Sequence, residues 1–558
     1  MPTLSNGIRG LLLVSTTAVL IASGACKSDQ PSTSTTPFDP GAPLVKFSTS
    51  HFEGSGNCAV CHSNLKDASG NDVSIDTQWR STIMANAAKD PYFLAKTASE
   101  AANLPSLKGA IEDACATCHM PMAQTQAAAD ETATGMLGSG FLNTSNPLNK
   151  TAMDGNSCTL CHQIKADGLG TAATLGGAYK IDTSTASPNR IEYGPYPSPL
   201  TGPMQSLVGF TPAQGAQQNS AGLCATCHTV YTPIVDAKNN VVGTFPEQTA
   251  YLEWSASSYG SNPAAQLACQ SCHMAPASGA VAVSNNPTTL APRSPYYQHA
   301  FIGGSSLILK MMGSQVPQLG ITASSEQMLA TSALTATQLG SKAAQITVTS
   351  SSIADGKLNV TLSVSDQTGH KFPTGFPSRR AWIEFTVADS SGKVVFESGK
   401  VKADGSITGN DADAKNGAFE PHYDVITKSD QVQIYESIMA NTDGKVTYNI
   451  IKGASYLKDN RILPAGFDKA KAPQDAGVYG DAFSDANFKG GSDQVTYQVS
   501  VGGTGPYTVT ARLLYQTVSY QFSKAFVGSD ALVKNFTSLY QSADKAPNLV
   551  STVTKTVS

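Results

Sequence analysis

The sequence predicts an α+β protein in which a region of short helices and long loops is followed by an antiparallel β-sandwich-like domain. Two observations support this fold class. Residues 50–300 hold five C-x-x-C-H motifs, show little periodicity and are rich in Gly, Asn, Ser and Pro. Beyond residue 343, short runs alternate apolar and polar side chains and are separated by glycine-containing turns. Such alternation is typical of strands that bury one face.

The first 26 residues have the features of an export signal. Arg9 supplies a positive charge ahead of an apolar run at 11–22, which is too short to span a membrane. Small residues then precede Cys26, as at a bacterial lipoprotein cleavage site, although Ser23 stands where Leu is usual. We predict that Cys26 becomes a lipidated N-terminus. The alternative is a simple signal peptide with an incidental cysteine.

Residues 27–45 are rich in Pro, Ser and Thr and predict a flexible linker after Cys26. No later segment contains 18 uninterrupted apolar residues, so we expect no transmembrane helix. These features together predict an exported protein, an outer-membrane lipoprotein on the periplasmic or cell-surface side. The chain has 558 residues and a net charge of −4, which argues against a nucleic-acid partner.

Ten of the eleven cysteines fall into five C-x-x-C-H motifs, and the eleventh is Cys26. They are numbered motif 1 (58–62), motif 2 (115–119), motif 3 (158–162), motif 4 (224–228) and motif 5 (269–273). The paired cysteines are Cys58 and Cys61, Cys115 and Cys118, Cys158 and Cys161, Cys224 and Cys227, and Cys269 and Cys272. The histidines that follow them are His62, His119, His162, His228 and His273.

This spacing is the attachment signature of c-type haem. Two thiols one helical turn apart reach the two vinyl groups of one porphyrin, and the next imidazole is the proximal ligand of the iron. Disulfides would not explain a histidine after every second cysteine, and zinc ribbons need C-x-x-C pairs in even number. The sequence therefore predicts five haem c groups, which would form much of the core of a haem domain at 46–342.

The sequence leaves the choice of distal ligands open, because four histidines remain for five haems. The distal candidates are His51, His299, His370 and His422. His299 lies among aromatic residues and His370 lies in a Gly- and Pro-containing loop, so we rank these two first, then His51, then His422. The fifth haem must use a methionine, borrow a ligand from another chain or stay open. Met84, in a predicted short helix over 78–88, is a weak candidate, and Met120, Met122 and Met274 remain open.

The C-terminal half predicts a helix at 324–342, a β-sandwich-like domain at 343–525 and a helical tail at 526–558. Because this domain has no haem motif but carries His370 and His422, we expect it to pack on the haem domain and cover one or two irons. The alternating runs that predict strands are 357–364, 381–387, 446–450, 494–501 and 507–514.

Several segments resemble a family of multihaem c-type cytochromes exported to the outer surface of bacteria that respire on metals. They are QWRSTIMANAAKDPYF (78–93), CATCHMPMA (115–123), SCTLCHQI (157–164), GHKFPTGFPSRRAW (369–382), PHYD (421–424), VQIYE (432–436) and LKDNRILPAGF (457–467). The resemblance implies electron transfer without a bound substrate, and low-potential haems mostly ligated by two histidines. The family varies in haem number, so the number five rests on the motifs alone.

Electron transfer is the leading interpretation, with electrons passing to another cytochrome or redox protein, or to an extracellular metal or electrode acceptor. One variant is a filament or homo-oligomer in which one subunit supplies an axial ligand to the next. The rival class is an enzyme that reduces a small ligand such as nitrite or peroxide at an open haem. Pentahaem nitrite reductases carry a C-x-x-C-K motif at the catalytic haem, and this chain has none. We therefore expect an electron carrier rather than an enzyme.

Overall fold

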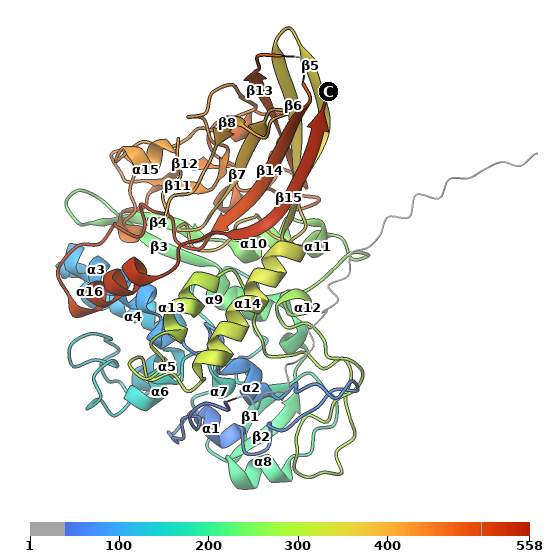
Figure 1. Ribbon diagram of the computed structural model, residues 1–558. Coiled ribbons are helices and arrows are strands. Elements are labelled where there is room, and N and C mark those ends of the chain that lie inside the picture. The colour runs from blue at the N-terminus through green and yellow to red at the C-terminus, as the bar shows by residue number, and fades with distance from the viewer. Residues whose placement is uncertain (1–38, 504) are drawn as a thin grey trace, which may run out of the picture.

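The computed structural model describes residues 39–503 and 505–558, so the predictions for the export signal, for Cys26 and for most of the linker lie outside the described residues. The fold is α+β, as predicted. Short helices dominate up to residue 342, and the long strands follow (Figure 1). No described helix is long and apolar enough to cross a membrane.

The N-terminal region is a set of short helices joined by long loops. Each haem motif lies on or at the end of one of them, and the last, α14, begins with a capping box between Ser324 and Gln327. The helices are α1 (Ser55–Cys58), α2 (Ile75–Trp79), α3 (Pro91–Asn103), α4 (Lys108–His119), α5 (Pro121–Ala129), α6 (Asn149–Met153), α7 (Cys158–Cys161), α8 (Gly202–Leu207), α9 (Ala221–His228), α10 (Ala250–Ser255), α11 (Ser258–Ser261), α12 (Cys269–His273), α13 (Ser306–Gly313) and α14 (Ser325–Lys342).

Two small strand pairs in this region have no counterpart in the sequence prediction. Strands β1 (Arg190–Gly194) and β2 (Phe210–Gln214) pair in parallel, whereas β3 (Val230–Val235) and β4 (Val241–Gln248) form an antiparallel hairpin. Burial along β2 and β3 does not alternate from residue to residue, so these strands lack the apolar–polar alternation that predicts a strand.

The C-terminal region contains two main sheets with a shared hydrophobic core between them. Alternate residues of β6, such as Leu358 and Val360, are fully buried in this core. One sheet has the order β5-β6-β13-β9, with strands β5 (Ala344–Ala354), β6 (Lys357–Asp366), β13 (Ser492–Ser500) and β9 (Val425–Ile426). The other has the order β10-β7-β14-β15 with β8 beside β7, and its strands are β10 (Ile434–Tyr435), β7 (Arg380–Ala388), β14 (Tyr507–Gln516), β15 (Asn548–Val557) and β8 (Val394–Ser398).

Three details differ from the sequence prediction. The run at 446–450 is not a strand, and β11 (Ser437–Ala440) and β12 (Ser455–Asp459) pair on either side of it. The short β9 pairs with β13 in parallel. The tail is helical only in α16 (Ala531–Ser542), after which β15 pairs along β14 and extends the sandwich to the end of the described chain.

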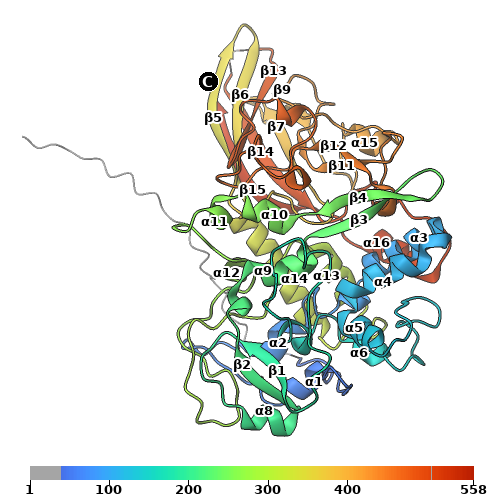
Figure 2. The same cartoon turned by 180° about the vertical axis from the view of Figure 1, so that it is seen from behind.

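The two regions share a hydrophobic cluster and are not independent units. In that cluster, Phe536 on α16 is fully buried and stacks obliquely on Tyr92 of α3, with ring centres 5.1 Å apart. Seen from behind, α16 lies beside α3 below the sandwich (Figure 2). This docking brings the edge of the sandwich over the C-x-x-C-H motifs.

Candidate haem sites

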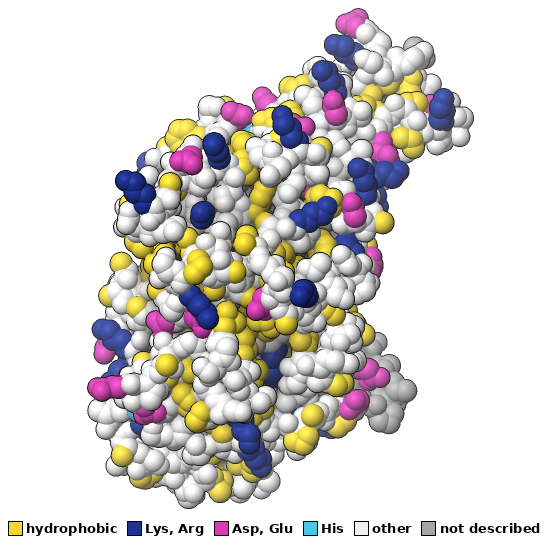
Figure 3. Space-filling view, turned by 90° about the vertical axis from the view of Figure 1, so that its left-hand side faces the viewer, with side chains coloured by type: hydrophobic (Ala, Val, Ile, Leu, Met, Phe, Trp, Pro, Cys, Tyr) yellow, Lys and Arg dark blue, Asp and Glu magenta, His cyan; other side chains and the backbone are white. Residues whose placement is uncertain are grey.

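A cavity of about 1420 Å³ lies between the N-terminal region and the edge of the sandwich. Ligand pockets usually have about 300–1,000 Å³, so this cavity is larger than one ordinary ligand requires. Motifs 1, 3, 4 and 5 line it, together with His299, His370 and Met84. On the face shown in Figure 3, hydrophobic side chains gather in a band along the middle of the molecule, with charged side chains scattered around it. The cavity can therefore hold several large apolar groups.

The cysteines of neighbouring motifs approach one another. Side-chain hydrogen bonds join Cys58 to Cys158, Cys118 to Cys227, and Cys224 to Cys269. Cys161 also lies close enough to Cys227 for the two thiols to interact electrostatically. All ten motif cysteines are free thiols, available for attachment. The motifs thus form a connected set in which the thiols of motif 4 bond to those of motifs 2 and 5 and lie near motif 3, and motif 1 bonds to motif 3.

Backbone carbonyl groups orient three of the motif histidines. In each, Nδ1–H donates to a carbonyl, so Nε2 keeps a lone pair that can bind a metal. The distances are 2.7 Å from His62 to Val283 O, 2.6 Å from His162 to Tyr193 O and 2.5 Å from His273 to Ile302 O. The corresponding contact of His119 with Ala87 O is longer, at 3.4 Å.

Two pairs of imidazole rings face each other across a gap that one iron would fill. The ring centres of His162 and His299 are 6.4 Å apart and their planes differ by 21°. Those of His273 and His370 are 6.2 Å apart, also at 21°. A metal–imidazole bond of about 2 Å, plus about 1 Å from the nitrogen to the ring centre, puts two axial imidazoles about 6 Å apart. Both gaps match axial ligation of one iron.

The distal histidines of these pairs are kept neutral, which metal ligation requires. Burial lowers the pKa of His299 to about 3, with a further contribution from His162 and then His62. Burial likewise lowers the pKa of His370 to about 4, and His273 adds to the effect. His370 Nδ1 donates to Lys371 O at 3.0 Å, which leaves its Nε2 unprotonated.

Motifs 1, 2 and 4 have no facing imidazole among the described residues, because His299 faces His162 of motif 3 and His370 faces His273 of motif 5. The ring of His119 instead stacks on Phe93, with ring centres 3.5 Å apart and planes 2° apart. Burial lowers the pKa of both His119 and His228 to about 4. Met84 lines the cavity from the turns that follow α2, where the sequence predicts a helix.

The structure does not bring His51 to a motif histidine. Its Nδ1 lies 3.0 Å from Gln126 Oε1 and its Nε2 lies 3.0 Å from Thr183 O. Both ring nitrogens are therefore engaged with the protein. His51 lies in a polar contact between segments, and nothing in this arrangement leaves a nitrogen for an iron.

His422 lies in the sandwich, away from the motifs, and its hydrogen bonds fix its tautomer. Its Nδ1 accepts from the amides of Gln433 at 2.9 Å and Asn460 at 3.1 Å. Both amides are oriented by backbone groups, since Gln433 Oε1 accepts from Tyr423 N and Asn460 Oδ1 accepts from Glu436 N. Nε2 must then carry the proton that it donates to Asp485 at 3.1 Å. Neither nitrogen is free to bind a metal, although Asp485 and Asp493 lie beside the ring.

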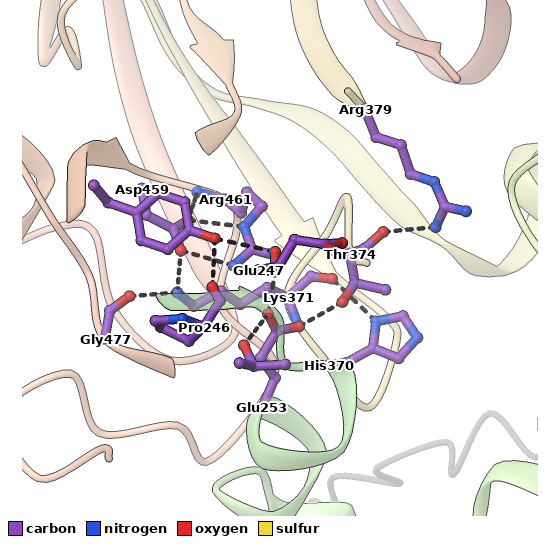
Figure 4. Close-up of polar contacts among 12 residues, drawn as sticks. Pro246, Glu247, Glu253, His370, Lys371, Thr374, Arg379, Asp459, Arg461 and Gly477 are labelled. Atoms are coloured by element: carbon purple, nitrogen blue, oxygen red, sulfur yellow. Dashed lines mark hydrogen bonds and ion pairs between the residues drawn. The ribbon is translucent and has the colours of Figure 1, made fainter. Parts of the chain in front are cut away.

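A buried ion network, not predicted from the sequence, supports the loop that presents His370 (Figure 4). The Nζ of Lys371 lies 2.7 Å from Asp459, and Arg461 bonds to both Asp459 and Glu253. Burial alone would raise the pKa of Asp459, but Arg461 and Lys371 together lower it to about 2. These residues come from separate parts of the chain. Lys371 lies in segment 369–382, and Asp459 and Arg461 lie in segment 457–467, two of the segments that resemble multihaem cytochromes.

Breaking this network should destabilise the fold strongly. Replacing Lys371 with Met removes one of the two buried cations and leaves Arg461 alone against the carboxylates of Asp459 and Glu253. Breaking a buried ion pair in this way typically costs about 3–5 kcal/mol in the free energy of unfolding. Denaturant unfolding of the purified protein measures this loss. The control is K471M, which removes an exposed Lys471–Asp468 pair and should cause no measurable change. Equal unfolding midpoints for K371M and the wild type would contradict the prediction.

No family model and no curated protein matches this sequence. A search of solved structures finds the crystal structure of a penta-heme cytochrome c552 from Thermochromatium tepidum. The two chains are 15% identical, the match covers 90% of this chain and 98% of the other, and the TM-score is 0.47. A likeness at this score does not establish a shared fold, so the ring pairs and thiol contacts remain the basis for interpretation.

Proposed function

We propose that the chain is a pentahaem c-type cytochrome that transfers electrons. The observation that carries this proposal is the pair of facing imidazoles, His162 with His299 and His273 with His370, each with a motif histidine on one side. A packed apolar core has no need of two such gaps, whereas axial ligation of iron requires them. The ten motif cysteines would hold five haems, and the five motif histidines would be their proximal ligands.

The chain's own residues would fix the haems and set their environment. The cysteines supply thioether bonds, the backbone carbonyls hold the imidazole tautomers, and the cavity walls exclude water. When bound, each haem iron supplies a one-electron oxidation and reduction. Because the thiols of adjacent motifs are in contact, the groups attached to them would lie edge to edge. Electrons could then pass along motifs 1, 3, 4 and 5, with motif 2 joined at motif 4.

A second candidate function is supported by motifs 1, 2 and 4, whose histidines face no second imidazole among the described residues. An iron there would use a methionine, a ligand from another chain or an open position, and an open position could reduce a small ligand such as nitrite or peroxide. Met84 remains a weak distal candidate because it lines the cavity. His51 and His422 are not proposed as ligands, since their ring nitrogens are engaged elsewhere.

Oxidation of the fully reduced protein distinguishes the two functions. For an electron carrier, an oxidised soluble cytochrome c should accept about five electrons per chain in stopped-flow mixing, one for each motif. Excess nitrite or hydrogen peroxide should leave the haems reduced over the same time. Rapid catalytic reoxidation by either small molecule, with turnover under a steady supply of electrons, would instead support the reductase.

We further propose that the protein is exported and anchored to the outer membrane by a lipid on Cys26, facing the periplasm or the cell surface. Its partners would be other redox proteins or extracellular metal or electrode acceptors, and a homo-oligomer or filament is a variant. The export signal, the cysteine at its end and the linker support this. The substitution C26S should move the protein from the membrane to the soluble fraction with its haems intact. Unchanged membrane fractionation would contradict the anchor.

A further inference from the structure

Arg379 is a half-buried cation in the wall of the haem cavity. It lies close to three of the predicted iron ligands, because its charge contributes to lowering the pKa of His228, His273 and His370. In Figure 4, its guanidinium and the ring of His370 lie on one side of the loop, and Lys371, Asp459 and Arg461 lie on the other. Arg379 thus faces the space between motifs 4 and 5 and takes no part in the ion network.

The loop holds the guanidinium in place. Arg379 Nη1 donates to Thr374 O at 2.7 Å, and the hydroxyl of Thr374 donates to Glu253 Oε2 at 2.6 Å. Gly375 lies against it with a positive φ of 81°, and a Cβ there would come within 2.9 Å of Nη1. The sequence around Arg379 therefore both positions the side chain and leaves room for it.

This guanidinium has no acidic partner among residues 39–503 and 505–558. Its side chain donates to the carbonyl of Thr374, and no carboxylate of the described residues forms an ion pair with it. A half-buried cation is partly withdrawn from water, and an anion that pairs with it offsets the lost hydration. A guanidinium in particular presents a planar fork of donors that fits a carboxylate.

We propose that Arg379 binds a carboxylate of the haem attached at motif 4 or motif 5, and thereby raises the reduction potential of that haem. This inference rests on the proposed function, because the porphyrin of haem c carries the carboxylates. The same fork would also accept a small free oxyanion, so the shared chemistry is an oxyanion site beside these two motifs. Among the two sources, the attached porphyrin is favoured because the thiols of motifs 4 and 5 already touch beside the site.

The sign of the effect on potential follows from charge. A nearby positive charge disfavours the oxidised iron, which carries one more positive charge than the reduced iron. Loss of the guanidinium should therefore stabilise the oxidised form. The expected change is about tenfold in the ratio of reduced to oxidised haem at a fixed potential, or about 59 mV for a one-electron couple.

The test compares R379Q, R379K and the wild type, each first shown to carry five haems, by potentiometric titration and absorbance. In R379Q, one haem should titrate at a lower potential while the low-spin spectrum is kept, and R379K should recover most of the difference. The matched control is R293Q, which removes a second arginine of the cavity wall that lies over the ring of Tyr196. It should leave the haem affected by R379Q at its wild-type potential.

Titration of the oxidised proteins with sodium nitrite separates the two sources of the oxyanion. If R379Q lowers one haem potential, the absence of a nitrite response in both proteins assigns the site to the attached porphyrin. A response in the wild type that R379Q loses assigns the site to a free anion and would overturn the haem carboxylate as its partner. Unchanged potentials in R379Q, with no nitrite response, would overturn the proposal. So would loss of low-spin ligation in both R379Q and R379K, which would show that Arg379 only supports the loop. A haem count other than five would instead count against the proposed function.

Discussion

Substituting His370 with alanine should convert one haem in five from low-spin to high-spin and open it to carbon monoxide. His370 lies 6.2 Å from His273, ring centre to ring centre, so its removal deletes one of two axial imidazoles. The adjacent ion network involves the backbone and side chain of Lys371, not the ring of His370, so the fold should survive. The reduced H370A protein should bind one more carbon monoxide per chain than the wild type.

Two variants of the other distal candidates are the controls. H422Q and H51Q change histidines whose nitrogens bond to protein groups, so neither should change the haem spectra or the number of carbon monoxide molecules bound. An H370A protein with wild-type carbon monoxide binding would contradict the ligand assignment. So would an H422Q protein that gained a binding site, because it would place His422 on an iron.

Removing the haem of motif 4 should interrupt electron transfer more than removing that of motif 2. The double variant C224A/C227A deletes the motif whose thiols bond to motifs 2 and 5 and lie near motif 3. It should keep four haems per chain and fold in lower yield. Because its remaining haems form disconnected groups, they should be reduced in separate fast and slow phases. Stopped-flow reduction of the purified protein measures these phases.

The matched variant is C115A/C118A, which also deletes one haem but leaves motifs 1, 3, 4 and 5 connected. Motif 2 does not line the main cavity, so this protein should fold in better yield and reduce its four haems together. If both double variants were reduced in one phase at the wild-type rate, motif 4 would not be the junction that the thiol contacts indicate.

The sequence was sufficient for those features that depend on neighbouring residues. The C-x-x-C-H motifs, the helix at α14 and the strands β6, β7, β13 and β14 each carry a local signal of spacing or alternation. The strand β15 was missed because it follows a clear helix at the end of the chain, and its pairing with β14 is decided by tertiary contact. The parallel pairing of β9 with β13 is also non-local.

The order of residues along the chain does not show which histidine faces a motif histidine, or which buried charges have a partner. The sequence ranked His299 above His422 by its aromatic neighbours, but only the folded chain puts His299 opposite His162 and gives His422 two amide donors. Arg379 was visible in the resembling segment 369–382 without a role, because its lack of an acidic partner is a property of the whole molecule. The same holds for the network of Lys371 and Asp459.

Location of the irons in the exported holo-protein tests the central claim most directly. Anomalous diffraction at the iron edge should reveal five irons per chain, one within bonding distance of both His162 and His299 and another within bonding distance of both His273 and His370. An iron count other than five would contradict the account, as would finding those two gaps without metal between the rings.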